Sequence, residues 1–128
     1  MIAFDTNYLV RHIVQDDARQ CRTVATTLKN EVESDSPILI LDMVLMETCW
    51  VLENVYEFDR DALGEVLESL LEDSAFCFEN SQRLRSVLKQ FCNGKADFAD
   101  YMISSKAHAE GFELKSFDKQ LLKELRRG

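Results

Sequence analysis

The chain has little of what marks fibrous, disordered or repetitive proteins. Its 128 residues include only four glycines and one proline, and no low-complexity linker or internal repeat is visible. Apolar residues make up 46% of the chain and charged residues 30%, which is the balance of an ordinary globular protein. At this length the sequence predicts one compact domain over residues 1–128.

Long hydrophobic runs and a secretion signal are also missing. The longest uncharged apolar stretches, such as residues 38–41, fall far short of the roughly 20 residues that a membrane-spanning helix needs, and residues 1–5 contain no basic segment. The four cysteines lie far apart, without a C-x-x-C pair or paired histidines nearby, which argues against a disulfide framework and a zinc site. We therefore expect a cytoplasmic protein with buried thiols and no membrane contact.

An excess of positive charge is absent as well. The chain has 15 Lys and Arg residues against 23 Asp and Glu residues, and its formal net charge is −8. General nucleic-acid binders neutralise phosphates with an excess of Lys and Arg. Any contact of this protein with nucleic acid must therefore be local.

Four short runs are predicted to form strands. Residues 1–5 and 37–41 are apolar and lead to an aspartate, while residues 75–79 and 112–117 have the length and aromatic content of strands. Segments with apolar residues at helical spacing separate these runs. The two clearest stripes are Val24, Leu28 and Val32, and Leu63, Val66, Leu67, Leu70 and Leu71. The alternation predicts an α/β domain with a mainly parallel sheet of four or five strands.

Helix ends can be placed from local signals. Asp59 and either Asn80 or Ser81 are suited to cap the helices that follow them, and Gly94 and Gly111 are expected to end helices.

Several acidic residues stand where such a fold would bring them together. Asp5 ends the first predicted strand, Asp118 ends the last, and Asp97 and Asp100 open the helix between them. Glu47 lies one turn into the helix after residues 37–41, with its carboxylate expected on the semi-buried side. Ligands of open parallel sheets bind beyond the carboxyl ends of the strands, so we expect these acids near one edge.

Each acid also has a structural alternative. Asp5 and Asp118 could cap the helices that follow, and for Asp97 the cap is the favoured interpretation. Asp100 cannot be the N-cap if Asp97 is, and Glu47 has no capping role. Trp50 could be a stacking platform for a base, but its helical spacing from Glu47 favours a core position.

Clustered carboxylates repel one another unless a cation stands between them. An all-oxygen set of ligands, without nearby Cys or His, selects Mg²⁺ or Mn²⁺ over Zn²⁺. A metal ion held in this way can activate water for phosphodiester hydrolysis. The acids therefore predict a hydrolase with a divalent metal site.

Four motifs in this order resemble those of the PIN-domain ribonucleases, and most closely the VapC-type toxins of toxin-antitoxin pairs. They are residues 4–7 (FDTN), 46–52 (METCWVL), 96–100 (ADFAD) and 116–119 (SFDK). The resemblance implies a three-layer α/β/α fold and a cytoplasmic endoribonuclease. It also implies two partners besides the RNA substrate, namely a cognate antitoxin and a second copy of the chain. The apolar stripes named above are the expected surface for association.

The resemblance assigns roles residue by residue. It makes Asp5, Glu47, Asp100 and Asp118 the catalytic acids that hold the metal, and Asp97 a further ligand, through water, or a helix cap. Thr6 and Asn7 match a turn that would hold Asp5 in place, and Ser116 matches a hydroxyl residue before the last acid. Two alternatives stay open: a PIN-like module that binds a protein without catalysis, and a nuclease that cuts structured DNA.

Overall fold

The computed structural model describes residues 1–127. The chain forms two compact units, Met1–Ser81 and Gln82–Gly128, which are described separately. No helix within the described residues is long and apolar enough to cross a membrane.

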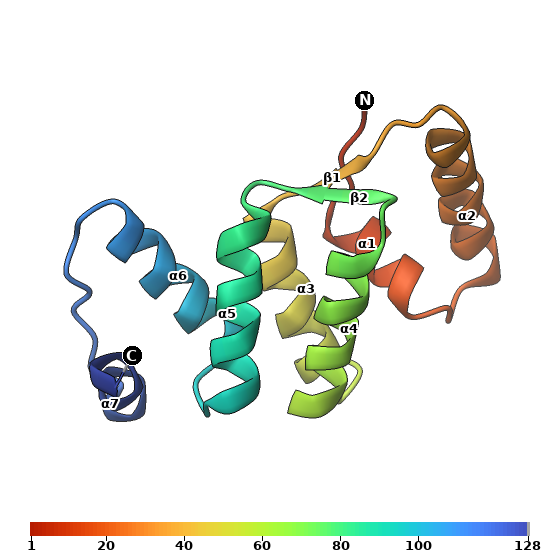
Figure 1. The fold of residues 1–128 in the computed structure, drawn as a ribbon. Coiled ribbons are helices and arrows are strands. Elements are labelled where there is room, and N and C mark those ends of the chain that lie inside the picture. Colours follow the sequence, from red (N-terminus) through yellow and green to blue (C-terminus); the bar gives the residue numbers. More distant parts are fainter. Residues whose placement is uncertain (128) are drawn as a thin grey trace. The chain divides into compact units, whose positions relative to one another are not determined.

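A small parallel sheet organises the first unit. Strand β1 (Ile38–Ile40) pairs with β2 (Phe76–Phe78), with Ile38 opposite Phe76 and Ile40 opposite Phe78 (Figure 1). On the other side of β1, Ala3 forms a parallel bridge to Leu39. These pairings confirm the predicted parallel arrangement of the first three runs.

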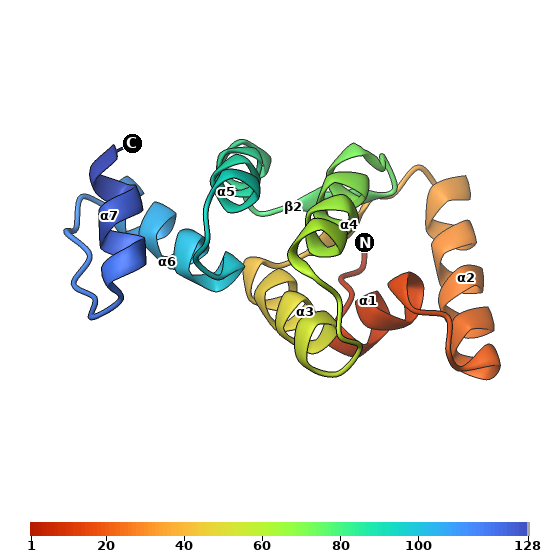
Figure 2. The same cartoon turned by 90° about the horizontal axis from the view of Figure 1, so that it is seen from below.

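Four helices belong to the same unit: α1 (Thr6–Ile13), α2 (Ala18–Glu33), α3 (Asp42–Asn54) and α4 (Arg60–Glu72). Three of them begin after an aspartate whose carboxylate accepts a backbone N–H of the first turn, and these caps are Asp5, Asp17 and Asp59. Helix α1 contacts both α2 and α3, and Figure 2 shows it between them. The position of Asp5 is therefore fixed by a cap and by a helix packed on two sides.

The second unit contains α5 (Ser81–Asn93) from its second residue onward, α6 (Phe98–Ala109) and α7 (Lys119–Arg127). The ring of Phe91 on α5 lies edge-on to the rings of Phe98 and Tyr101 on α6, with centroids 6.0 and 6.5 Å apart. Gly94 directly follows α5, and Gly111, with a φ of 82°, follows the end of α6. Both helix ends agree with the sequence.

The sequence predicted a sheet of four or five strands, and this number was wrong: the described residues form β1 and β2. Residues 112–117 form no strand, and residues 1–5 contribute only the bridge at Ala3. A strand needs a partner for its backbone groups. In the described part of the second unit the regular elements are helices, so residues 112–117 have no strand there to pair with. The α/β class is confirmed, but the sheet is smaller than the runs of apolar residues indicated.

Two predictions about burial also need correction. Trp50 is 63% exposed, because α3 buries Leu45, Cys49 and Leu52 on another face; Glu47 is exposed with it. All four cysteines are free thiols, but only Cys49 is buried, and Cys92 is exposed. Helical spacing showed that α3 is amphipathic without showing which face meets the core.

Candidate functional site

In the first unit, a hydrogen bond joins the start of α1 to the middle of α3. The Thr6 hydroxyl donates to Glu47 Oε1 at 3.0 Å. Next to it, Asp5 caps α1 by accepting the Tyr8 backbone N–H on Oδ1 at 2.9 Å. Thr6 thus orients Glu47, whereas the resemblance had implied that it holds Asp5. Asn7 is exposed beside them and forms no side-chain hydrogen bond with the described residues.

The capping role of Asp5 leaves it able to bind a metal ion. An ionised carboxylate can accept about four hydrogen bonds or metal contacts, and the cap uses one. The side chains of Asp5 and Glu47 are both exposed. The two alternatives for Asp5 are therefore compatible: it caps α1, and its remaining lone pairs face solvent.

In the second unit, three acids mark the starts of two helices. Asp97 is the N-cap of α6 and forms a capping box with Asp100, whose carboxylate accepts the Asp97 backbone N–H at 3.2 Å. Asp118 caps α7 by accepting the Leu121 N–H at 3.0 Å, and its own N–H donates to Ser116 Oγ at 3.0 Å. The capping interpretation of Asp97 is borne out. Asp100 also has a structural role, and Ser116 holds the backbone of the last acid.

The acids of the second unit influence one another electrostatically. Burial raises the pKa of Asp100, and the charges of Asp97 and Asp118 raise it further, while the hydrogen bond from the Asp97 backbone acts in the opposite direction. Ionised Asp100 is therefore in an unfavourable environment. A cation placed near it would relieve this cost.

The structure thus groups the predicted acids in two sets. Asp5 and Glu47 are linked through Thr6 in the first unit, and Asp97, Asp100 and Asp118 interact in the second. Among residues 1–127, no group of three or more His, Cys, Asp and Glu side chains lies close enough to hold a metal ion.

A brace between α6 and α7 holds the segment that leads to Asp97. The buried Tyr101 hydroxyl donates to Glu124 Oε2 at 2.9 Å and accepts the Ala96 N–H at 3.2 Å, while the Lys95 N–H donates to Glu124 Oε1 at 2.8 Å. Sequence reasoning did not identify Tyr101 or Glu124. The sequence had pointed to this place only through Gly94, as a helix end. In the structure, a Cβ added at Gly94 would collide with the Tyr101 hydroxyl and with Glu124 Oε1.

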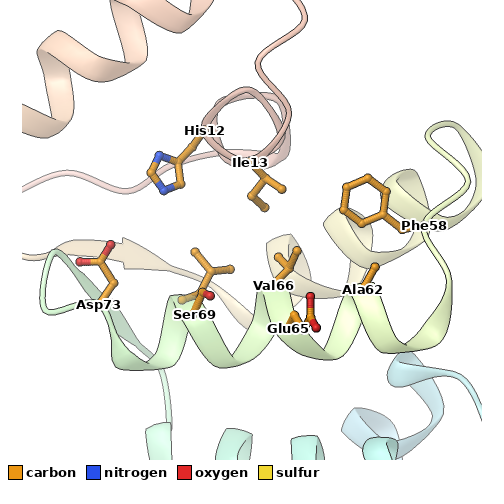
Figure 3. Close-up of a pocket in the computed structure, with 9 residues that line it drawn as sticks. His12, Ile13, Phe58, Ala62, Glu65, Val66, Ser69 and Asp73 are labelled. Atoms are coloured by element: carbon orange, nitrogen blue, oxygen red, sulfur yellow. The ribbon is translucent and has the colours of Figure 1, made fainter.

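A groove lies between the end of α1 and α4, and none of the five predicted metal-binding acids lines it. It has a volume of about 370 Å³, with His12 and Ile13 on one side and Ala62, Val66 and Ser69 on the other (Figure 3). Burial lowers the pKa of His12, and the nearby Asp73 carboxylate partly offsets that shift. His12 is therefore neutral at pH 7.

We expect Asp100→Asn to raise the melting temperature of the metal-free protein at neutral pH. The raised pKa of Asp100 means that its ionisation opposes folding above the ordinary value of 3.8, and that this cost disappears once the carboxyl is protonated. The variant's advantage should therefore grow between pH 4 and pH 7, as thermal melts in chelator would show. Glu113→Gln, an exposed acid outside the set, is the control. An equal gain in melting temperature at pH 4 and pH 7 would contradict the unfavourable environment of ionised Asp100.

Comparison with known proteins identifies the family of this chain. The PIN domain profile matches residues 2–127, which include both units and all five acids. The chain is similar to the VapC ribonuclease of Aquifex aeolicus (strain VF5), with 24% identity over 124 residues that cover 96% of this chain and 91% of the relative. No solved structure gives a significant match. Because the profile spans nearly the whole chain, this protein belongs to the PIN domain family.

Proposed function

We propose that this protein is a metal-dependent endoribonuclease and the toxin of a toxin-antitoxin pair. The observation that supports it most directly is the pair of exposed carboxylates, Asp5 and Glu47, linked through Thr6 in a chain of the PIN family. The similarity to a protein named VapC ribonuclease supports RNA as the substrate.

The ligands of the proposed ion, Mg²⁺ or Mn²⁺, are Asp5, Glu47, Asp100 and Asp118. All donors are carboxylate oxygens, which suits these ions, and the unfavourable charge at Asp100 calls for a cation. When bound, the ion supplies an activated water and offsets charge on the leaving oxygen. The chain's own contribution is to fix the acids: Thr6 orients Glu47, and Ser116 holds the backbone of Asp118.

Asp97 has a smaller role in this proposal, because its capping position accounts for it. Asn caps helices about as well as Asp. Asp97→Asn is therefore expected to reduce cleavage less than Asp100→Asn does. Equal losses would show that Asp97 is a ligand.

Cleavage assays with Mn²⁺ separate the proposal from its alternatives. We expect cleavage of single-stranded RNA and not of structured DNA, no cleavage in chelator, and a melting temperature that rises in millimolar Mn²⁺ because the ion binds only the folded site. Glu47→Gln should reduce that rise. A metal-induced rise of the melting temperature without any cleavage would favour a module that binds a protein. Cleavage of structured DNA but not of RNA would favour a DNA nuclease. No shift and no cleavage would refute the site.

The groove of Figure 3 is the proposed docking surface for the antitoxin. Its walls are apolar at Ile13 and Val66, and Glu65 and Asp73 add negative charge to its lining. It therefore suits a peptide with apolar side chains and Lys or Arg. The seven-residue distance along α1 from His12 back to Asp5 is about 10 Å, so three or four further residues of an extended tail would bring a cation to the acids and displace the metal.

Val66→Glu should abolish copurification with the proposed antitoxin, because it adds a charge to the apolar wall. Val55→Glu, which alters an exposed valine at the end of α3 outside the groove, should not. Equal retention of the partner by both variants would argue against docking in this groove.

We also propose a homodimer, although on a narrower surface than the sequence indicated. The stripe on α4 is buried at Leu63, Leu67 and Leu70, whereas Val32 on α2 is 55% exposed. Light scattering at micromolar concentration should give about twice the chain mass of 14.8 kDa. A monomer would contradict this.

A further inference from the structure

A hollow of about 460 Å³ opens beside Asp5, between α1 and the first half of α2. This volume lies within the range of small-ligand pockets. Its walls carry mostly polar and charged side chains, with Tyr8 and Val24 as the apolar part. The residues that line it are Asp5, Asn7, Tyr8, Arg11, Asp17, Arg19, Gln20, Thr23 and Val24. Because Asp5 is part of the wall, a ligand that fills the hollow reaches the carboxylate.

Arg11 is a fixed cation in this wall. Its Nε donates to Gln20 Oε1 at 2.7 Å, and its Nη1 donates to Asp16 Oδ1 and to the Tyr56 hydroxyl, both at 2.9 Å. The Tyr56 hydroxyl in turn donates to Asp16 Oδ2 at 2.9 Å. These bonds hold the guanidinium in one orientation without occupying all five of its donors.

Arg19 supplies a second, unengaged cation on α2. It is exposed, and its side chain forms no ion pair or hydrogen bond with residues 1–127. Asp17, the nearest acid along the chain, accepts the Gln20 N–H as the cap of α2. Arg19 is therefore available to an anionic ligand.

Tyr8 adds an aromatic surface to the hollow that these cations and Asp5 also line. Its half-buried ring packs on Phe4, with the ring centroids 5.0 Å apart. Packing on one side restricts the ring, and the ring also lines the hollow. A restrained aromatic ring next to cations is the combination that binds single-stranded nucleic acids.

We propose that this hollow binds one nucleotide of single-stranded RNA adjacent to the phosphodiester that is cleaved at Asp5. Arg19 and Arg11 contact its phosphate, and Tyr8 stacks on its base. This inference rests on the proposed nuclease function and adds a substrate subsite to it. The polar lining and the two arginines favour an RNA strand here, whereas the apolar groove of Figure 3 suits a peptide.

The test is steady-state cleavage of a fluorescently labelled single-stranded RNA oligonucleotide at several salt concentrations. Arg19→Ala should raise KM about tenfold and change kcat less than twofold. It should also lower the slope of log KM against log salt by about 0.7, the contribution of one phosphate contact on a single strand. Arg22→Ala is the matched control, because it removes the same charge from an exposed position on α2 that does not line the hollow.

The aromatic contact is tested separately. Tyr8→Leu should raise KM at least fivefold, and Tyr8→Phe should restore it, because the phenyl ring still stacks. If Tyr8→Leu lowers the melting temperature, the Arg19 comparison still decides the proposal. If the wild-type protein cleaves RNA but Arg19→Ala and Arg22→Ala have the same KM and the same salt slope, the subsite is overturned and the proposed nuclease function stands. Failure of the wild-type protein to cleave RNA would overturn both.

Discussion

Asp5→Asn should reduce metal-dependent RNA cleavage by a hundredfold or more while the protein stays folded. The substitution removes the charge that the metal requires of a ligand, and loss of a ligand disables water activation. The Asn side-chain oxygen can still accept the Tyr8 N–H that Asp5 accepts at 2.9 Å, so α1 keeps its cap. Single-turnover cleavage in saturating Mn²⁺ would measure the loss of activity, and a thermal melt would confirm the fold.

Asp59→Asn is the matched control for this variant. Asp59 caps α4 by accepting the Ala62 N–H at 2.8 Å, the same interaction that Asp5 makes on α1, and it is exposed as Asp5 is. It should therefore reproduce any cost of changing a cap without affecting cleavage. Equal cleavage rates for the two variants would remove Asp5 from the metal site.

Gly94→Ala should destabilise the protein by about 2–4 kcal/mol, the range for overpacking combined with the loss of buried hydrogen bonds. The new Cβ would collide with the Tyr101 hydroxyl and Glu124 Oε1, and would meet the Gln90 carbonyl oxygen at 3.0 Å. Tyr101 is buried and cannot move freely, so the brace must open. Urea unfolding, followed by circular dichroism, would give the free energy of unfolding.

Two further variants separate the collision from ordinary glycine effects. Gly111→Ala should cost only about 1 kcal/mol, because its φ of 82° is strained for alanine but nothing lies within 4 Å of the new Cβ. Tyr101→Phe should recover part of the stability of Gly94→Ala, since it removes one of the two atoms that collide. If Gly94→Ala were as mild as Gly111→Ala, the brace would contribute little to stability.

The predictions that succeeded are those for which a few neighbouring residues determine the outcome. The runs at residues 37–41 and 75–79 became β1 and β2 because buried apolar segments of that length fit a central sheet. Asp59, Asp97 and Gly111 mark helix ends because caps depend on the backbone within one turn. The order of the four acidic motifs was enough to identify the PIN family.

The tertiary structure decided what depends on distant segments. It placed Trp50 on an exposed face of α3, linked Thr6 to Glu47 rather than to Asp5, and formed the brace between Tyr101 and Glu124. The two hydrogen bonds join elements that are separated along the chain. The helical or strand period of a sequence shows only that an element has two faces. Which face meets the core, and whether residues 112–117 find a strand to pair with, depends on the packing of all the elements together.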